Sequence, residues 1–169
     1  MRFTLLDRVV ELQPGKRITA VKAVSLAEEY LGDHFPRFPV LPGVFMLEAM
    51  TQAAAWTIRL GEDFAHSMVV LRAARNVKYG DFVEPGKVLT VTAEVLDQDE
   101  STTSVKASGM VDGRSSLTAR LKLYRYNLAD SDPSKAFLDR MVRADMRRFW
   151  AILNPSPAVA DPAPGAQPG

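Results

Sequence analysis

Residues 31–56 carry the groups needed to move protons beside a carbonyl. His34 can act as a base near neutral pH. Glu48 lies in an apolar stretch, where desolvation favours the protonated acid and makes it a candidate proton donor. Gly43 and Val44 stand where a helix is expected to begin, so their backbone N–H groups can stabilise an oxyanion. Base, acid and oxyanion donor together are what an elimination of water next to a carbonyl requires.

Each of these residues has a plainer interpretation when taken alone. A single histidine among prolines, as at His34, is more often structural than catalytic. The second histidine, His66, falls in a polar loop that is typical of the surface. The chemical hypothesis therefore depends on the combination and not on any one side chain.

A helix must position these groups. Pro42 suits the first helical position and Gly61 follows the last apolar residue, so we expect a helix over residues 42–60. The segment is apolar on nearly every side, which is typical of a helix enclosed by other elements or crossing a membrane. It is short for a membrane span and has Glu48 and Gln52 at its middle, so the enclosed helix is the better interpretation.

Glu48, Thr51 and Gln52 follow the spacing i, i+3, i+4 and so share one helix face. Buried carboxylates are rare unless they are paired or functional. This narrow polar stripe on an otherwise apolar helix therefore indicates a site.

Composition excludes several classes of protein. The 169 residues suffice for one domain with a core, and the net charge of +1 gives no sign of nucleic-acid binding. The absence of cysteine excludes disulfides, a thiol nucleophile and cysteine-bound metals. The first residues hold no apolar signal core and no stretch is long enough to span a membrane, so we expect a cytoplasmic protein.

The remaining segments predict a mainly antiparallel sheet. A Pro-Gly turn at 14–15 separates two extended segments, and Asp112-Gly113 is a strong hairpin turn. Ser25 and Glu28 form a capping-box pattern that predicts one helical turn over 25–30. The expected strands cover residues 3–11, 17–24, 68–79, 88–96, 102–111 and 116–126.

Five or six antiparallel strands and one buried helix predict an α+β fold, a curved sheet wrapped round the helix, over residues 1–130. A second, amphipathic helix is expected within 131–153, from about Ser134. It either docks on the sheet or a partner subunit with a solvated basic face, or forms a docking patch for an acidic carrier protein. Residues 154–169 are dense in Pro, Ala and Gly and are predicted to be a disordered tail.

The segment HFPRFPVLPGVFMLEAMTQAA closely resembles the signature of bacterial 3-hydroxyacyl-[acyl-carrier-protein] dehydratases of the hotdog fold. Weaker similarity extends over roughly residues 3–126, and the chain departs from the family at Asp33, where a glycine commonly precedes the histidine. The matching positions are His34, Phe35, Pro36, Pro39, Pro42, Gly43, Val44, Glu48, Ala49, Met50, Gln52 and Ala53.

The resemblance implies that His34 is the catalytic histidine and Glu48 the catalytic acid. It implies that Gly43 offers its N–H to the thioester carbonyl and that Gln52 supports Glu48. Val44 and Phe35 join Gly43 and Gln52 as expected substrate-binding positions. The product of such an enzyme is a trans-2-enoyl thioester.

The family also implies an assembly. Each site is shared across a homodimer, with the histidine from one chain and the carboxylate from the other, and dimers can assemble into hexamers. The substrate is a thioester of acyl carrier protein or CoA, and neither a metal nor an organic cofactor takes part. Two alternatives stay open: a hotdog thioesterase, and a non-catalytic acyl-binding subunit of a lipid or polyketide pathway.

Overall fold

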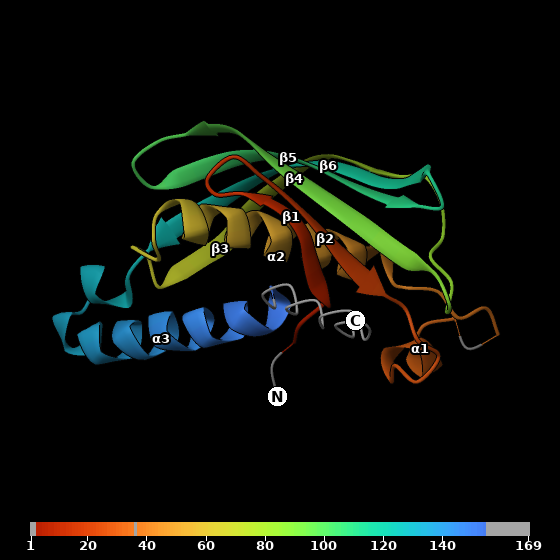
Figure 1. Ribbon diagram of the computed structural model, residues 1–169, viewed down its shortest axis with the longest axis horizontal. Helices are drawn as coiled ribbons and strands as arrows, with labels where there is room; N and C mark the ends of the chain where they lie inside the picture. The colour runs from red at the N-terminus through yellow and green to blue at the C-terminus, as the bar shows by residue number, and fades with distance from the viewer. Residues whose placement is uncertain (1–2, 36, 155–169) are drawn as a thin grey trace, which may run out of the picture.

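A six-stranded antiparallel sheet curves over one long helix (Figure 1). The computed structural model describes residues 3–35 and 37–154. The strand order is β1-β2-β4-β5-β6-β3, so β1 and β3 are the two edges. The strands are β1 (Arg8–Gln13), β2 (Arg17–Ala23), β3 (Met68–Tyr79), β4 (Val88–Gln98), β5 (Thr102–Val111) and β6 (Arg114–Tyr126).

The strands follow from alternation and turn chemistry. Every second residue is buried along the first half of β4 and along most of β5 and β6, which places one side of each strand on the core. The β5–β6 hairpin turns at Asp112 (φ 50°) and Gly113 (φ 77°), the left-handed pair that a tight hairpin requires. The predicted α+β arrangement is confirmed, although the first strand begins at Arg8 and not at residue 3.

Helix α2 (Gly43–Gly61) lies against the concave face of the sheet, and Pro42 precedes its first turn as the N-cap residue. Its apolar side chains meet those of the sheet in one continuous core. Burial of such side chains stabilises the fold by about 1.5–3 kcal/mol for each large one. Its buried residues are Met46, Ala49, Met50, Thr51, Ala53, Ala54, Ala55, Trp56, Thr57 and Ile58.

The C-terminal end of α2 is pressed against the β1–β2 turn. The backbone N–H of Gly15 donates to the carbonyl of Thr57 at 2.9 Å, and the Thr57 hydroxyl donates to the Gln13 carbonyl at 3.3 Å. A Cβ on Gly61 would lie 2.4 Å from the Gly15 Cα. Only a glycine at position 61 allows the two backbones to approach this closely.

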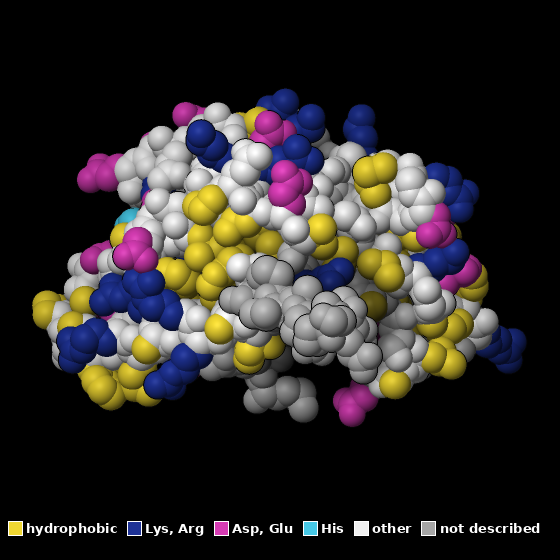
Figure 2. Space-filling model, in the orientation of Figure 1, with side chains coloured by type: hydrophobic (Ala, Val, Ile, Leu, Met, Phe, Trp, Pro, Cys, Tyr) yellow, Lys and Arg dark blue, Asp and Glu magenta, His cyan; other side chains and the backbone are white. Residues whose placement is uncertain are grey.

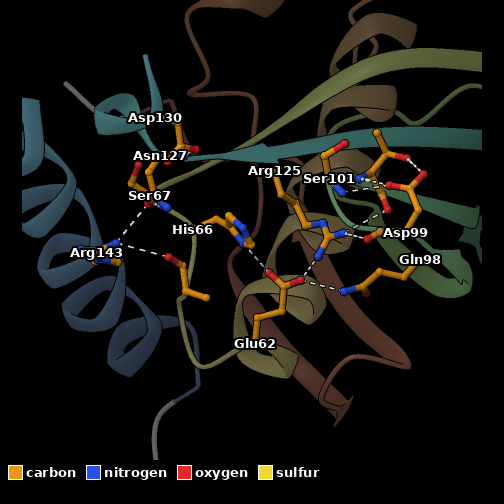
Figure 3. A network of polar contacts seen from close by, with 12 residues as sticks. Glu62, His66, Ser67, Gln98, Asp99, Ser101, Arg125, Asn127, Asp130 and Arg143 are labelled. Atoms are coloured by element: carbon orange, nitrogen blue, oxygen red, sulfur yellow. Dashed lines mark hydrogen bonds and ion pairs between the residues drawn. The ribbon is translucent and has the colours of Figure 1, made fainter. Parts of the chain in front are cut away.

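A polar network holds the same end of α2 to the sheet (Figure 3). The Glu62 carboxylate accepts hydrogen bonds from Arg125 and, at 2.7 Å, from Gln98, and it pairs with His66 at 2.9 Å. The buried Arg125 guanidinium also donates to the carbonyls of Asp99 and Thr102. The buried cation is thus paired with a carboxylate and two carbonyls, although its Nε atom has no acceptor among the described residues.

A third helix, α3 (Ala136–Leu153), lies on the side of α2 that faces away from the sheet (Figure 1). It follows two 3-10 turns, η1 (Leu128–Asp130) and η2 (Pro133–Lys135). The Trp56 ring of α2 contacts the rings of Phe149 and Trp150, with centroids 5.9 and 5.6 Å away. The predicted second helix is therefore confirmed, and its aromatic side chains pack on Trp56 of α2.

Asp139 anchors α3 to the chain that precedes it. Its buried carboxylate accepts hydrogen bonds from the Ser67 hydroxyl and from the backbone N–H groups of Leu128 and Ala129, the last two at 2.9 Å. Burial alone would raise the pKa of Asp139, but these hydrogen bonds outweigh that effect and the pKa is lowered. The ionised form is therefore the one that holds α3 in place.

Two predictions fail. Residues 25–29 form a turn, and the short helix α1 begins only at Tyr30 and ends at Asp33. Of the expected capping box, the Ser25 N–H does donate to the Glu28 carboxylate at 3.4 Å, but the Ser25 hydroxyl accepts from Ala27. Glu28 also binds Lys22 of β2 at 2.5 Å, which ties the segment to the sheet. The predicted tail at 154–169 lies, apart from its first residue, outside the described residues.

The second failure concerns α2, which is not enclosed on all sides by its own chain. Val44 is 65% exposed, and Leu47 and Glu48 are only partly buried. Within the described residues, no helix is long and apolar enough to cross a membrane.

Candidate active site

The predicted site residues fall into two cavities. The first, which we call the His34 pocket, has a volume of about 290 Å³ and opens at the N-terminal end of α2. It is lined by His34, Phe35, Val40, Leu41, Gly43, Met46, Tyr79, Gly80, Asp81 and Phe82. Figure 2 shows exposed hydrophobic side chains gathered over this end of the molecule, near α1.

His34 is the residue that caps the C-terminal end of α1. Its backbone N–H donates to the carbonyl of Tyr30 at 3.1 Å, which fixes where the side chain leaves the backbone. The imidazole contacts the ring of Phe35 at a centroid distance of 4.3 Å. Phe35 has a φ of 51°, a left-handed conformation that costs free energy for a residue with a side chain. The loop thus holds the imidazole in a defined position at the pocket wall.

The first turn of α2 forms the floor of the His34 pocket. The N–H groups of Phe45 and Met46 donate to the Pro42 carbonyl, whereas those of Gly43 and Val44 have no acceptor among the described residues and are available to a ligand. The Tyr79 ring lies against Gly43, since a Cβ there would be 2.6 Å from the ring. A small residue at position 43 therefore leaves room both for Tyr79 and for a ligand oxygen at the amide.

The second cavity, which we call the Glu48 groove, has a volume of about 340 Å³ and runs along another side of α2. Residues of α2, the N-terminal segment, β3 and α3 form its walls. It is lined by Phe3, Thr4, Glu48, Thr51, Gln52, Ala55, Trp56, Arg59, Val69, Met146 and Phe149. The predicted polar stripe Glu48-Thr51-Gln52 thus faces this groove.

Gln52 joins Glu48 to the N-terminal segment. Its side-chain amide donates to the Glu48 carboxylate at 3.0 Å and to the Phe3 carbonyl at 3.2 Å. Its carbonyl oxygen accepts from the backbone N–H of Leu5 at 3.0 Å. The amide is therefore held from both sides, and it can in turn fix the orientation of the carboxylate.

The two cavities are separated by a ridge on α2. Gly43 and Glu48 are five residues apart, which at 3.6 residues per turn places them about 140° apart round the helix. Val44 projects between them and lines neither cavity. Within one chain, His34, Phe35 and Gly43 are brought together, Glu48 and Gln52 are brought together, and the two groups remain apart.

Two wall residues were missed by the sequence analysis. Tyr79 ends β3 and only the fold brings it to Gly43. Arg59 has a signal that could have been followed, because it lies seven residues after Gln52 and continues the Glu48 stripe. Among the described residues, no group of three or more His, Asp or Glu side chains is placed to hold a metal ion.

The arginines of α3 are largely engaged within the chain. Arg143 donates to the Asn127 side chain at 3.1 Å, and Arg147 binds Asp63 at 2.8 Å. Arg148 pairs with Asp145 of the same helix at 3.7 Å. Figure 2 shows basic side chains over α3 interspersed with hydrophobic ones. These contacts favour the interpretation of α3 as a docked helix over that of a carrier-docking patch.

A curved antiparallel sheet wrapped round one helix, with polar groups at the start and middle of that helix, defines a hotdog-fold protein. A FabA-like domain matches residues 1–120. The chain therefore belongs to the FabA-like family.

Named relatives support this assignment. The chain is 38% identical over 120 residues to a 3-hydroxyacyl-[acyl-carrier-protein] dehydratase FabZ of Ruminiclostridium cellulolyticum, covering 71% of this chain and 84% of the relative. It is 36% identical over 133 residues to a FabZ of Janthinobacterium sp., covering 77% and 85%. Among solved structures, the dehydratase heterocomplex ApeI:P from Xenorhabdus doucetiae matches with a TM-score of 0.62 and 26% identity, covering 75% of this chain and 85% of that one.

Proposed function

We propose that this protein is a hydro-lyase that removes water from 3-hydroxyacyl thioesters of acyl carrier protein in fatty-acid biosynthesis, giving trans-2-enoyl thioesters. The observation that carries the proposal is the placement of an imidazole, free helix N-terminal amides and an amide-held carboxylate on cavities beside one helix. The FabZ dehydratases that resemble the chain perform this chemistry, as their name states.

The proposed reaction uses each group once. His34 removes the proton from the carbon next to the thioester carbonyl, and the backbone N–H of Gly43 stabilises the enolate oxygen that forms. The electron pair then forms the carbon–carbon double bond as the bond to the 3-hydroxyl breaks. Glu48, protonated, gives its proton to the departing oxygen, which leaves as water. Proton transfer from the histidinium back to the carboxylate restores both groups.

A homodimer completes the site in this proposal. Val44 and its neighbours leave an apolar ridge exposed between the cavities, and β3 is an open edge of the sheet along 12 residues. Two copies related by a two-fold axis on this ridge would bring the His34 pocket of one chain to the Glu48 groove of the other. Val44 and Phe35 then serve as the walls where the two chains and the substrate meet.

The direct test is a product assay. The protein is incubated with 3-hydroxyacyl thioesters of acyl carrier protein, and enoyl product and free thiol are measured separately by mass spectrometry. The proposal expects enoyl thioester without release of thiol. Release of the carrier thiol would instead identify a thioesterase, and absence of both products would support a non-catalytic acyl-binding subunit.

The shared site has its own test. His34→Ala and Glu48→Gln variants, each inactive alone, are mixed under conditions of subunit exchange. Random pairing makes half of the dimers mixed, and each mixed dimer has one intact site of two, so about a quarter of the wild-type activity returns. If each chain contained a complete site, mixing would restore nothing.

A further inference from the structure

Arg59 lines the Glu48 groove about three helical turns beyond Glu48. The two residues lie on the same stripe of α2, 11 positions apart, which corresponds to about 16 Å along the helix. A molecule that lies in the groove with one end at Glu48 therefore extends toward a guanidinium at the other.

The Arg59 guanidinium lacks an anionic partner. Among the described residues, its buried Nε atom has no hydrogen-bond acceptor and no carboxylate lies within ion-pair distance of the guanidinium. The Nε atom of Arg125 also has no acceptor there, so the missing carboxylate is the feature that distinguishes Arg59 from Arg125. The guanidinium lies over the Trp56 ring, whose centroid is 5.9 Å from the guanidinium carbon. Burial lowers the pKa of Arg59 to about 10, with no opposing contribution from a carboxylate.

Other arginines near α2 show how this chain usually compensates a cation. Arg125 is buried and pairs with Glu62, and Arg147 at the edge of α3 pairs with Asp63. Arg59 is only partly buried, but its Nε atom is buried and its charge has no carboxylate partner among the described residues, an arrangement that destabilises a fold and is unusual without a role. Arg59 is thus set apart by its environment and not by its residue type.

The walls between Glu48 and Arg59 suit a hydrocarbon chain. Ala55 and Trp56 of α2, Val69 of β3 and the side chains of Met146 and Phe149 from α3 are apolar. The helix α3 therefore contributes to the groove as well as to the fold. A groove with apolar walls and one cation at its end matches an aliphatic chain that ends in an anion.

We propose that the Glu48 groove binds acyl chains whose far end carries a carboxylate, with Arg59 as the counter-ion. The inference rests on the proposed function in one respect, namely that the thioester end of the acyl group lies near Glu48. It adds a substrate class, the half-thioesters of dicarboxylic acids, and a specificity-determining residue.

The test is a binding measurement that needs no turnover. Pantetheine thioesters of straight-chain dicarboxylic acids and of monocarboxylic acids with the same number of carbons are titrated by calorimetry over a series of lengths. The proteins are wild type, Arg59→Leu, Arg59→Lys and the control Arg148→Leu, which removes an exposed arginine of α3.

At the length that spans the groove, wild type is expected to bind the carboxylate-ended thioester about tenfold more tightly than its methyl-ended match, the effect of one charge-assisted hydrogen bond. Arg59→Leu should lose this preference, Arg59→Lys should keep part of it, and Arg148→Leu should keep all of it. Arg59→Leu should also melt no lower than wild type, because it removes an uncompensated cation.

Equal or weaker binding of the carboxylate-ended thioester by wild type at every length would overturn the inference, as would an unchanged preference in Arg59→Leu. The product assay on wild type separates this failure from that of the proposed function. If wild type shows a preference that depends on Arg59 but forms no enoyl product, the carboxylate subsite is supported and the proposed dehydratase activity is rejected.

Discussion

The two ends of α2 are built in opposite ways. At the C-terminal end, Glu62 is bound by three side chains and the backbone of Gly61 is in contact with that of Gly15. At the N-terminal end, Val44 is exposed, and the N–H groups of Gly43 and Val44 bind no carbonyl of the described residues. One end is closed by contacts within the chain, and the other is left open to a ligand or a partner.

The difference shows what each kind of polar group contributes. A buried group whose hydrogen bonds are all made stabilises the fold, whereas one that is left open is available for chemistry. Two glutamates 14 residues apart on and beside the same helix, Glu48 and Glu62, exemplify the two uses. Substitutions at the two ends should therefore separate activity from stability.

The largest expected effect is on activity at the open end. Glu48→Gln removes the proton donor and should lower the rate of enoyl formation by about 10²- to 10⁴-fold while leaving the melting temperature near that of wild type. Glu62→Gln makes the same chemical change at the closed end and serves as the control, with turnover per folded molecule retained. Equal losses of activity in both variants would contradict the division between the two ends.

The next effect is on stability at the closed end. Glu62→Leu leaves the buried Arg125 guanidinium without its carboxylate and should lower the free energy of unfolding by about 3–5 kcal/mol. Urea unfolding followed by circular dichroism measures it. Glu62→Gln, which keeps a hydrogen-bond acceptor, should fall between this variant and wild type. A stability unchanged in both would show that the network is not needed to hold α2.

Gly61→Ala tests the backbone contact. The added Cβ would meet the Gly15 backbone, which cannot rotate away as a side chain can, so we expect a loss of about 1–3 kcal/mol in the free energy of unfolding. Gly32→Ala is the matched control, because no heavy atom lies within 4 Å of a Cβ built there. A comparable loss in the two variants would indicate a general helix effect and not the contact with Gly15.

The smallest expected effect concerns one hydroxyl. Thr57→Val keeps the shape of the fully buried side chain but removes its hydrogen bond to the Gln13 carbonyl, at a cost of about 0.5–1.5 kcal/mol. Thermal unfolding detects it. Thr51→Val, whose hydroxyl bonds only to the preceding turn of the same helix at Leu47, should change the stability less. A larger loss of stability in Thr51→Val than in Thr57→Val would argue that the contact with the β1–β2 turn does not hold α2 in place.

Much of the fold was predictable, because Pro42 and Gly61 bound α2, β-branched residues begin β3, and the later hairpins have alternating side chains and turn signals. The exposure of Val44 could not be predicted, because an apolar helix face looks the same in sequence whether its own chain or another copy covers it. The short helix was misplaced because Glu28 binds Lys22, a residue of a neighbouring strand, and this tertiary contact overrides a local capping pattern.

The site was predicted residue by residue from types and spacing, but its division into two cavities was not. The helical period does place Gly43 and Glu48 on different sides of α2, yet only the fold shows that a wall stands between them. Arg59 was passed over because an arginine in the last turn of a helix is ordinarily explained by the helix dipole.

The carboxylate of Asp139 makes the attachment of α3 sensitive to acid. Because its pKa is lowered in the folded protein, its contribution is fully present above the value of an unfolded aspartate, about 3.9, and is lost as the pH falls through the lowered value. The apolar core between α2 and the sheet does not titrate. Acid below about pH 3.9 should therefore loosen α3, and the contact of Trp56 with Trp150, the two tryptophans of the chain, gives that release a fluorescence signal.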